Sequence, residues 1–276
     1  MWHRACRQTG KSLPFVTLVS RKHFETEEQM EASTKTGLLR RRQFICGCCA
    51  ALVGARMVPA IAAVGDDPKT APLARNEPHH HLVFQNDLVR VLRVLIPGGD
   101  STLWHEHNFD YIVLTLNGSK VRVEVAGDPQ ATAGTMETKS LRFVKYAGQH
   151  FVHRVANTDS VLNHQIDFEI IPPMPGGFGV SDRSAAPQHK IEIDNDRIRA
   201  WRIQLAPGEI ANAIVQKAPG LQFVVSGERI LETNAEGQGK EATVRPGDFA
   251  WLPSSTSRSL TNAGSSPLEL VEVELK

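Results

Sequence analysis

The chain has 276 residues, of which 41% are hydrophobic and 22% charged, a balance typical of globular proteins rather than disordered or fibrous ones. Its formal net charge of +1 and its aromatic content of 6% give no basis for nucleic-acid binding, which needs a basic surface or stacking rings. A chain of this length can form one large domain or two of ordinary size.

The segment 1–62 is predicted to be a leader that carries an export signal. Arg40-Arg41-Arg42 precedes an apolar and small-residue stretch at 45–55, and Ala60-Ile61-Ala62 has the small-x-small form that signal peptidase accepts. This order resembles a twin-arginine export signal, so we expect an exported protein, periplasmic or extracellular. The alternative is a short buried helix or a disordered leader. The apolar stretch is about half of the roughly 20 residues that a membrane span needs, so no span is predicted.

The rest of the chain contains an internal repeat. Asn86-Asp87 and Pro97-Gly98 bracket one stretch, and Asn195-Asp196 and Pro207-Gly208 bracket a similar one further along the chain. Asn86 and Asn195 lie 109 residues apart. A repeat of that length indicates a duplicated domain, because solenoid units repeat every ~20–50 residues. We expect a linker over 63–78, a first domain over 79–171, a Pro/Gly-rich linker over 172–187 and a second domain over 188–276.

Both copies have the pattern of β-strands. Short runs rich in Val, Ile and Leu are punctuated by Gly, Pro, Asn and Asp, and no long stretch has a helical period. Strands are predicted at 88–96, 120–125, 140–144 and 161–171, and again at 198–205, 222–225, 249–252 and 268–275. This favours an all-β protein with two antiparallel sandwiches or barrels, and double-sheet jelly rolls are the leading option.

The candidate chemistry lies in the first copy. Gly99, five further residues and His105-Glu106-His107 form one motif, and His153 with Asn157 four residues later forms a second. Residues two apart on a strand face the same side, so His105 and His107 could bind one metal ion. The two motifs resemble those of the cupin superfamily. The resemblance implies two tandem cupin-type jelly-roll barrels, a bicupin, with His105, His107 and His153 as metal ligands in the first.

The usual fourth ligand of that family, a glutamate, is replaced here by Tyr111. Its neighbour Asp110 faces the opposite side of the strand unless a bulge intervenes. The resemblance therefore implies a neutral three-histidine site, with Tyr111 as a distant ligand or as a catalytic hydrogen-bond donor beside the metal. Neutral imidazoles suit transition metals better than Mg or Ca. We expect a divalent transition metal, Fe first, with Cu, Ni, Zn or Mn as alternatives.

Other histidines receive no ligand role at this stage. His79-His80-His81 is interpreted as an exposed turn, His150 as a residue at the rim of the barrel, and His164 as a core or hydrogen-bonded residue. In the second copy, Ile214, Gln216 and Gly220 stand at the positions of His105, His107 and Tyr111, and Arg258 stands where His153 belongs. With no imidazole at these positions, the second copy is not expected to bind a metal. Arg258 either faces inward, as a holder of anions, or lies at the surface.

The resemblance implies a metal-dependent oxidoreductase similar to the quercetinase-like and three-histidine diketone-cleaving dioxygenases of the cupin superfamily. Its substrate would be a small enolic or phenolic compound bound in the first barrel. The alternative is a non-catalytic or isomerase-type bicupin that binds a small molecule. The expected partner is a small-molecule substrate, with no nucleic acid and no membrane span, and a homo-oligomer is left open.

Overall fold

The computed structural model describes residues 67–173 and 176–276, so the predicted export signal within 1–62 lies outside the described residues. Two short 3-10 turns, η2 (Pro68–Thr70) and η3 (Ala74–Asn76), precede the first strand. No helix in these two ranges is long and apolar enough to cross a membrane.

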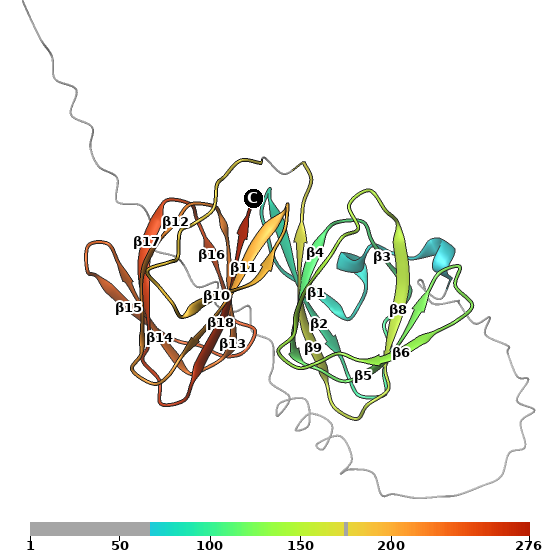
Figure 1. The fold of residues 1–276 in the computed structure, drawn as a ribbon. Helices are drawn as coiled ribbons and strands as arrows, with labels where there is room; N and C mark the ends of the chain where they lie inside the picture. Colours follow the sequence, from blue (N-terminus) through green and yellow to red (C-terminus); the bar gives the residue numbers. More distant parts are fainter. Residues whose placement is uncertain (1–66, 174–175) are drawn as a thin grey trace, which may run out of the picture. The chain divides into compact units, whose positions relative to one another are not determined.

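The first barrel is formed by antiparallel strands between residues 80 and 170 (Figure 1). Its five-stranded sheet has the order β1-β2-β9-β4-β7, and its four-stranded sheet has the order β3-β8-β5-β6. The strands are β1 (His80–Gln85), β2 (Val89–Ile96), β3 (His105–His107), β4 (Tyr111–Asn117), β5 (Lys120–Val125), β6 (Thr132–Thr135), β7 (Leu141–Val144), β8 (Phe151–Asn157) and β9 (Asn163–Ile170).

The second barrel repeats this plan between residues 189 and 275 (Figure 1). Its sheets have the orders β10-β11-β18-β13-β16 and β12-β17-β14-β15, which are the orders of the first barrel shifted by nine strands. The strands are β10 (His189–Asp194), β11 (Ile198–Leu205), β12 (Ile210–Gln216), β13 (Gly220–Ser226), β14 (Arg229–Asn234), β15 (Gly239–Thr243), β16 (Phe249–Leu252), β17 (Thr256–Asn262) and β18 (Leu268–Leu275). The all-β prediction with two jelly-roll barrels is confirmed.

The duplication extends to register and to single hydrogen bonds. His80 pairs with Val94 across β1 and β2, and their counterparts in the repeat, His189 and Ile203, pair across β10 and β11. The Asn157 amide donates to the carbonyls of Ile96 and Val161, and the Asn262 amide donates to those of Leu205 and Ser266. These bonds connect the end of β8 or β17 to the neighbouring sheet. The asparagine of the second motif therefore stabilises the same connection between sheets in both barrels.

Side chains alternate between the two faces of the five-stranded sheet, so residues of one strand belong to two separate apolar clusters. In β2, Val89 and Val91 belong to a large apolar cluster that also contains Phe223 and Val273 of the second barrel, whereas Val94 and Ile96 line the interior of the first. The same alternation places Phe168 of β9 in the shared cluster, opposite Val91. The five-stranded sheets therefore contact each other through one face and enclose their own barrel with the other.

Candidate metal centre

The predicted ligands converge from two adjacent strands of the four-stranded sheet. His105 and His107 on β3 are 1% and 2% exposed, and Glu106 between them faces the other side, as expected for alternation. His105 lies directly opposite His153 of β8. The ring centroids of His105 and His107 lie 4.5 and 5.1 Å from that of His153, and 5.1 Å from each other. The structure thus brings all three predicted ligands together inside the first barrel.

A fourth imidazole belongs to the cluster. His80 at the start of β1 is 6% exposed, and its ring centroid lies 4.5 Å from that of His105. Ring nitrogens of His80, His105 and His107 lie within 4.8 Å of one another. The interpretation of 79–81 as an exposed turn is wrong at His80, because β1 begins there and its pairing with Val94 turns the imidazole inward. The internal repeat, which aligns His80 with His189, is the sequence signal that could have revealed an inward-facing strand position.

Three imidazoles of the cluster, those of His105, His107 and His153, are held in the neutral form that binds metals. Burial lowers the pKa of His105 and of His107 well below the usual 6.5. The pKa of His153 is lowered to about 3, first by burial and then by repulsion from His80 and Arg142. At neutral pH these nitrogens therefore offer lone pairs without first losing a proton.

The free nitrogens of this cluster fit a transition-metal ion. His105 donates Nδ1–H to the Leu103 carbonyl at 2.9 Å, which leaves its Nε2 available to a ligand. His107 Nδ1 and His153 Nε2 are buried, and neither has a hydrogen-bond partner among the described residues. A buried polar atom without a partner costs about 1–3 kcal/mol, which a metal bond would offset. His80, His105 and His107 are the residues that would hold the ion, with His153 beside them.

The side chains of Tyr111 and Asp110 have different surroundings, as strand alternation predicts. The Tyr111 ring at the start of β4 stacks on His107, with centroids 4.6 Å apart and planes 9° from parallel. Burial, and then the nearby Asp167, raise the pKa of the Tyr111 phenol well above 10, so it stays protonated. Asp110 accepts hydrogen bonds from the backbone of Tyr146 and Ala147 instead of facing the imidazoles.

A cavity of about 30 Å³ lies among these side chains. Its lining includes the four histidines and Tyr111, and also Arg142, Gln165 and Asp167. Burial raises the pKa of Asp167 to about 7, and repulsion from Glu169 adds to this, while His80 and Arg142 oppose it. Asp167 is absent from the site predicted from the sequence. Polar residues at 165, 167 and 169, all on one face of a predicted strand, are the signal that could have found it.

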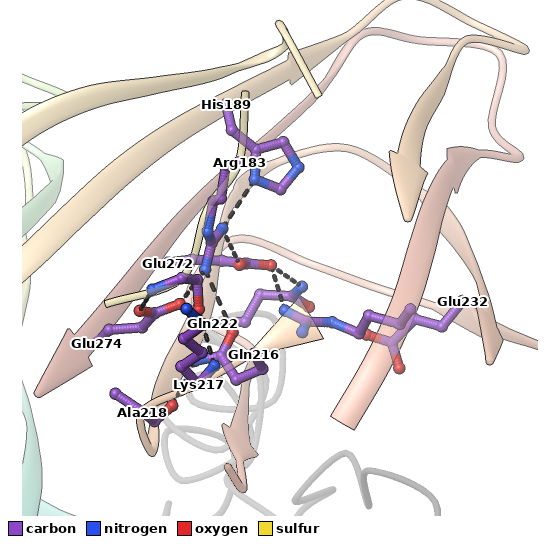
Figure 2. Close-up of polar contacts among 11 residues, drawn as sticks. Arg183, His189, Gln216, Lys217, Ala218, Gln222, Glu232, Glu272 and Glu274 are labelled. Atoms are coloured by element: carbon purple, nitrogen blue, oxygen red, sulfur yellow. Dashed lines mark hydrogen bonds and ion pairs between the residues drawn. The ribbon is translucent and has the colours of Figure 1, made fainter. Parts of the chain in front are cut away.

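The equivalent place in the second barrel contains a polar network instead (Figure 2). Ile214 pairs with Arg258 across β12 and β17, as His105 pairs with His153 in the first barrel. Arg258 is 4% exposed, and its Nη2 donates to Glu272 Oε1 at 2.6 Å. The surface alternative for Arg258 is therefore wrong. Its guanidinium faces inward, and a carboxylate of this chain binds it.

Arg183 completes the network from the segment before β10 (Figure 2). It donates to Glu272 at 2.6 Å, to Glu274 at 2.8 Å and to His189 Nδ1 at 2.7 Å. His189 is the counterpart of His80. The second barrel therefore keeps one imidazole at a position equivalent to a member of the cluster, although this position is not one of the predicted ligand positions. At the counterpart of Tyr111, a Cβ on Gly220 would lie 1.8 Å from the Val273 carbonyl oxygen, so only glycine fits there.

Comparison with known proteins finds likeness at the level of structure. No family model and no curated protein matches the sequence. Solved structures that resemble the chain include AerE from Microcystis aeruginosa, at 10% identity over 72% of this chain and 98% of that one, with a TM-score of 0.51. They also include Lactobacillus farciminis oxalate decarboxylase in a formate complex, at 11% identity, 68% and 77% coverage and a TM-score of 0.50.

A cupin 2 conserved barrel domain protein from Leptotrichia buccalis is also similar, at 10% identity over 71% of this chain and 88% of that one, with a TM-score of 0.45. At such identities a structural likeness establishes architecture and leaves activity to the residues of the site. Together with the strand order and register, the likeness to AerE and to oxalate decarboxylase shows that the chain has the fold of two tandem jelly-roll barrels.

Proposed function

We propose that this protein is a metal-dependent oxidoreductase of the dioxygenase type that acts on a small enolic or phenolic compound in the first barrel. The observation that carries the proposal is the group of four imidazoles around one cavity, three of them buried and that of His153 half-buried, beside the protonated phenol of Tyr111. Imidazole ligands favour redox-active ions such as Fe or Cu over Mg or Ca. Such an ion would supply the electron exchange between an organic substrate and dioxygen.

The surrounding side chains bind and orient the substrate. The Tyr111 phenol can donate a hydrogen bond to an oxygen of an enol or phenol, because its raised pKa keeps the proton on the ring oxygen. Arg142 lines the same cavity and places a fixed positive charge near any enolate or phenolate. Asp167, with its pKa of about 7, can hold or release a proton at neutral pH.

The small cavity restricts the substrate and excludes water. A volume of about 30 Å³ is small beside the roughly 300–1,000 Å³ of ordinary ligand pockets, so a substrate must displace part of the lining to enter. Met136 is the flexible apolar residue of that lining, and its unbranched side chain can change rotamer at low cost. Compact substrates are therefore favoured over large polycyclic ones.

The pKa of Asp167 favours a second candidate function, an isomerase that moves a proton within its substrate. A general base works best when its pKa lies near the working pH, and Asp167 meets this condition inside the cavity. Such an enzyme would exchange substrate hydrogen with solvent and would not consume dioxygen.

Oxygen uptake by the metal-loaded protein separates the two functions. We expect uptake with small 1,3-diketones or catechol-like phenols, and we expect its loss in His107→Ala. Gln216→Ala changes the equivalent residue of the second barrel and should leave uptake unchanged. If none of these compounds gives oxygen uptake, but solvent deuterium enters them in the presence of protein, the isomerase replaces the dioxygenase proposal.

We also propose that the protein is exported by the twin-arginine route. The basic, apolar and small-residue regions within 40–62 support this, in the order that such signals use. Residues 30–70 fused to a reporter that folds before translocation should send it out of the cytoplasm, and Arg41→Lys with Arg42→Lys should stop this. Normal export of the double variant would refute the proposal.

A further inference from the structure

Glu77 is a buried carboxylate in the N-terminal strap, the name used here for residues 67–79 before β1. It is 1% exposed and accepts hydrogen bonds from His79 N, His79 Nδ1, His80 Nδ1 and Leu103 N. Its two oxygens thus face four nitrogen donors, an arrangement that suits an acceptor-only carboxylate. The strap is also joined to the barrel where Glu106 N donates to the Pro72 carbonyl at 2.8 Å.

The ionised Glu77 determines which nitrogen of His80 carries hydrogen. A carboxylate only accepts, so His80 must donate from Nδ1. In the neutral ring, Nε2 then has a bare lone pair. Because Nδ1 is engaged with Glu77, Nε2 is the nitrogen available to the group that also contains His105 and His107. A carboxylate behind an imidazole is the usual means of orienting a metal-binding histidine.

In His189, the counterpart of His80, Nδ1 faces a guanidinium instead of a carboxylate (Figure 2). Its Nδ1 lies 2.7 Å from Nη1 of Arg183, and a guanidinium only donates, so His189 Nδ1 must accept. The hydrogen of the neutral ring is therefore on Nε2, which is buried without an acceptor. Burial lowers the pKa of His189 to about 4, so the ring is neutral at pH 7. The residue equivalent to Glu77 is Ala186, which has no carboxylate to reverse this.

We propose that Glu77 is a positioning residue that makes His80 a metal ligand, supplied by the strap–β1 junction. Two histidines at one position of a duplicated fold are thus held in opposite tautomers, and only the one backed by a carboxylate can bind a metal ion. The inference rests on the proposed metal centre, and it adds the residue that orients one of its ligands.

A double-mutant cycle on zinc affinity tests the proposal without recourse to turnover. Glu77→Gln keeps the shape of the side chain but replaces one carboxylate oxygen with a donor. We expect it to weaken Zn²⁺ binding by about 10- to 100-fold, the usual cost of losing such an outer partner. In a His80→Ala background the same change should alter affinity by less than about 2-fold. Equal losses in both backgrounds would show that Glu77 acts through something other than His80 and would overturn the proposal.

Two further variants and one spectrum complete the experiment. Asp100→Asn removes the other carboxylate that holds His79 and should leave zinc affinity within about 2-fold of the wild type. His80→Gln keeps a donor for Glu77 and should weaken binding even if Glu77→Gln fails to fold. The absorption bands of bound Co²⁺ should lose intensity or shift in His80→Gln, as expected when one nitrogen leaves the ion. Wild-type affinity and spectrum in that variant would refute the role of His80. Failure of the metal centre itself would appear instead as no zinc binding by the wild type.

Discussion

Both barrels bury two carboxylates at equivalent positions of their last strand, but each barrel places different groups beside them. In the first, Asp167 and Glu169 on β9 lie near the imidazole cluster. In the second, Glu272 and Glu274 on β18 bind the guanidinium groups of Arg183 and Arg258. The register Leu92–Asp167 is matched by Trp201–Glu272, so these are the same places in the fold.

The difference shows two ways to compensate buried negative charge. The second barrel carries its two positive charges on covalently attached side chains, which are always protonated. The first barrel offers neutral nitrogens beside Arg90, which pairs with Glu169, and Arg142 in the cavity lining, and on the proposed function a bound ion would supply the remaining positive charge. On this proposal the second barrel reaches its final structure without a ligand, whereas the interior of the first would be completed by the ion. Four predictions test this contrast.

The largest effect is expected on metal binding. His107→Ala removes a ligand and should weaken metal binding by more than about 100-fold, since losing even an outer partner costs roughly 10- to 100-fold. Gln216→Ala at the equivalent position should have no effect, and the wild type should bind one ion per chain. Elemental analysis of the purified variants measures this. Two tightly bound ions per chain that both survive His107→Ala would contradict the asymmetry between the barrels.

Breaking the guanidinium network should destabilise the second barrel without changing metal affinity. Arg258→Met keeps an apolar stem but leaves Glu272 with less compensation, at a cost of about 3–5 kcal/mol. The combination of Arg258→Met with Glu272→Gln should be less destabilising than the sum of the single changes, because the uncompensated charge is removed as well. Urea unfolding followed by circular dichroism gives these free energies. Additive losses would show that the two groups do not act as a pair.

Tyr111→Phe separates catalysis from metal binding in the first barrel. The change removes only the hydroxyl and should keep the ring stacked on His107. Metal affinity should stay within a few-fold, while turnover should fall by roughly ten- to a thousand-fold if the phenol donates a hydrogen bond in the transition state. Loss of metal as complete as in His107→Ala would instead identify Tyr111 as a ligand.

The smallest effect concerns pH and the contact between the barrels. His164 occupies the position equivalent to Glu269, and burial together with the nearby Arg93 lowers its pKa to about 4. The unfolded chain, with a pKa near 6.5, then binds more protons than the folded one between pH 6.5 and 4, so stability falls as pH decreases through that window. The contribution is at most about 3 kcal/mol.

His164→Gln should make the unfolding free energy less dependent on pH between 6.5 and 4. Arg202 and Lys139 bind Glu269 and lower its pKa, so this carboxylate should stay ionised in the same window and lose its contribution only in stronger acid. Unfolding curves at several pH values test both statements. An unchanged slope in His164→Gln would contradict the first.

The sequence predicts the fold well where its pattern reports local structure. The Asn-Asp and Pro-Gly repeats bracket β2 and β11, and the predicted strand at 88–96 begins only one position before the observed Val89–Ile96. His105 and His107 could be predicted because strand alternation alone places them on one face. These features depend on neighbours in sequence, and one chain is enough to find them.

The remaining site residues could not be predicted from local pattern. Asp167 reaches the cluster because β9 pairs with β2, a strand far from it in sequence. His80 reaches it through the pairing of β1 with β2, and three adjacent histidines look polar and exposed when this pairing is unknown. The direction of Arg258 depends on its partners Glu272 and Glu232, carboxylates of other strands that only the fold brings together. Asn157 fits a metal motif in the sequence, but its equivalent Asn262 makes the same hydrogen bonds in a barrel without that site.

The tight approach of β13 to β18 at Gly220 affects how the two barrels could have diverged. Single substitutions could introduce histidine at positions 214, 216 and 258, one position at a time. A tyrosine at 220 could not be introduced in this way, because even its Cβ would overlap the Val273 carbonyl oxygen and the strand would first have to move. If both copies descend from a barrel with a side chain at this position, the backbone change made the loss effectively one-way. Later selection for metal chemistry could then act on the first copy far more readily than on the second.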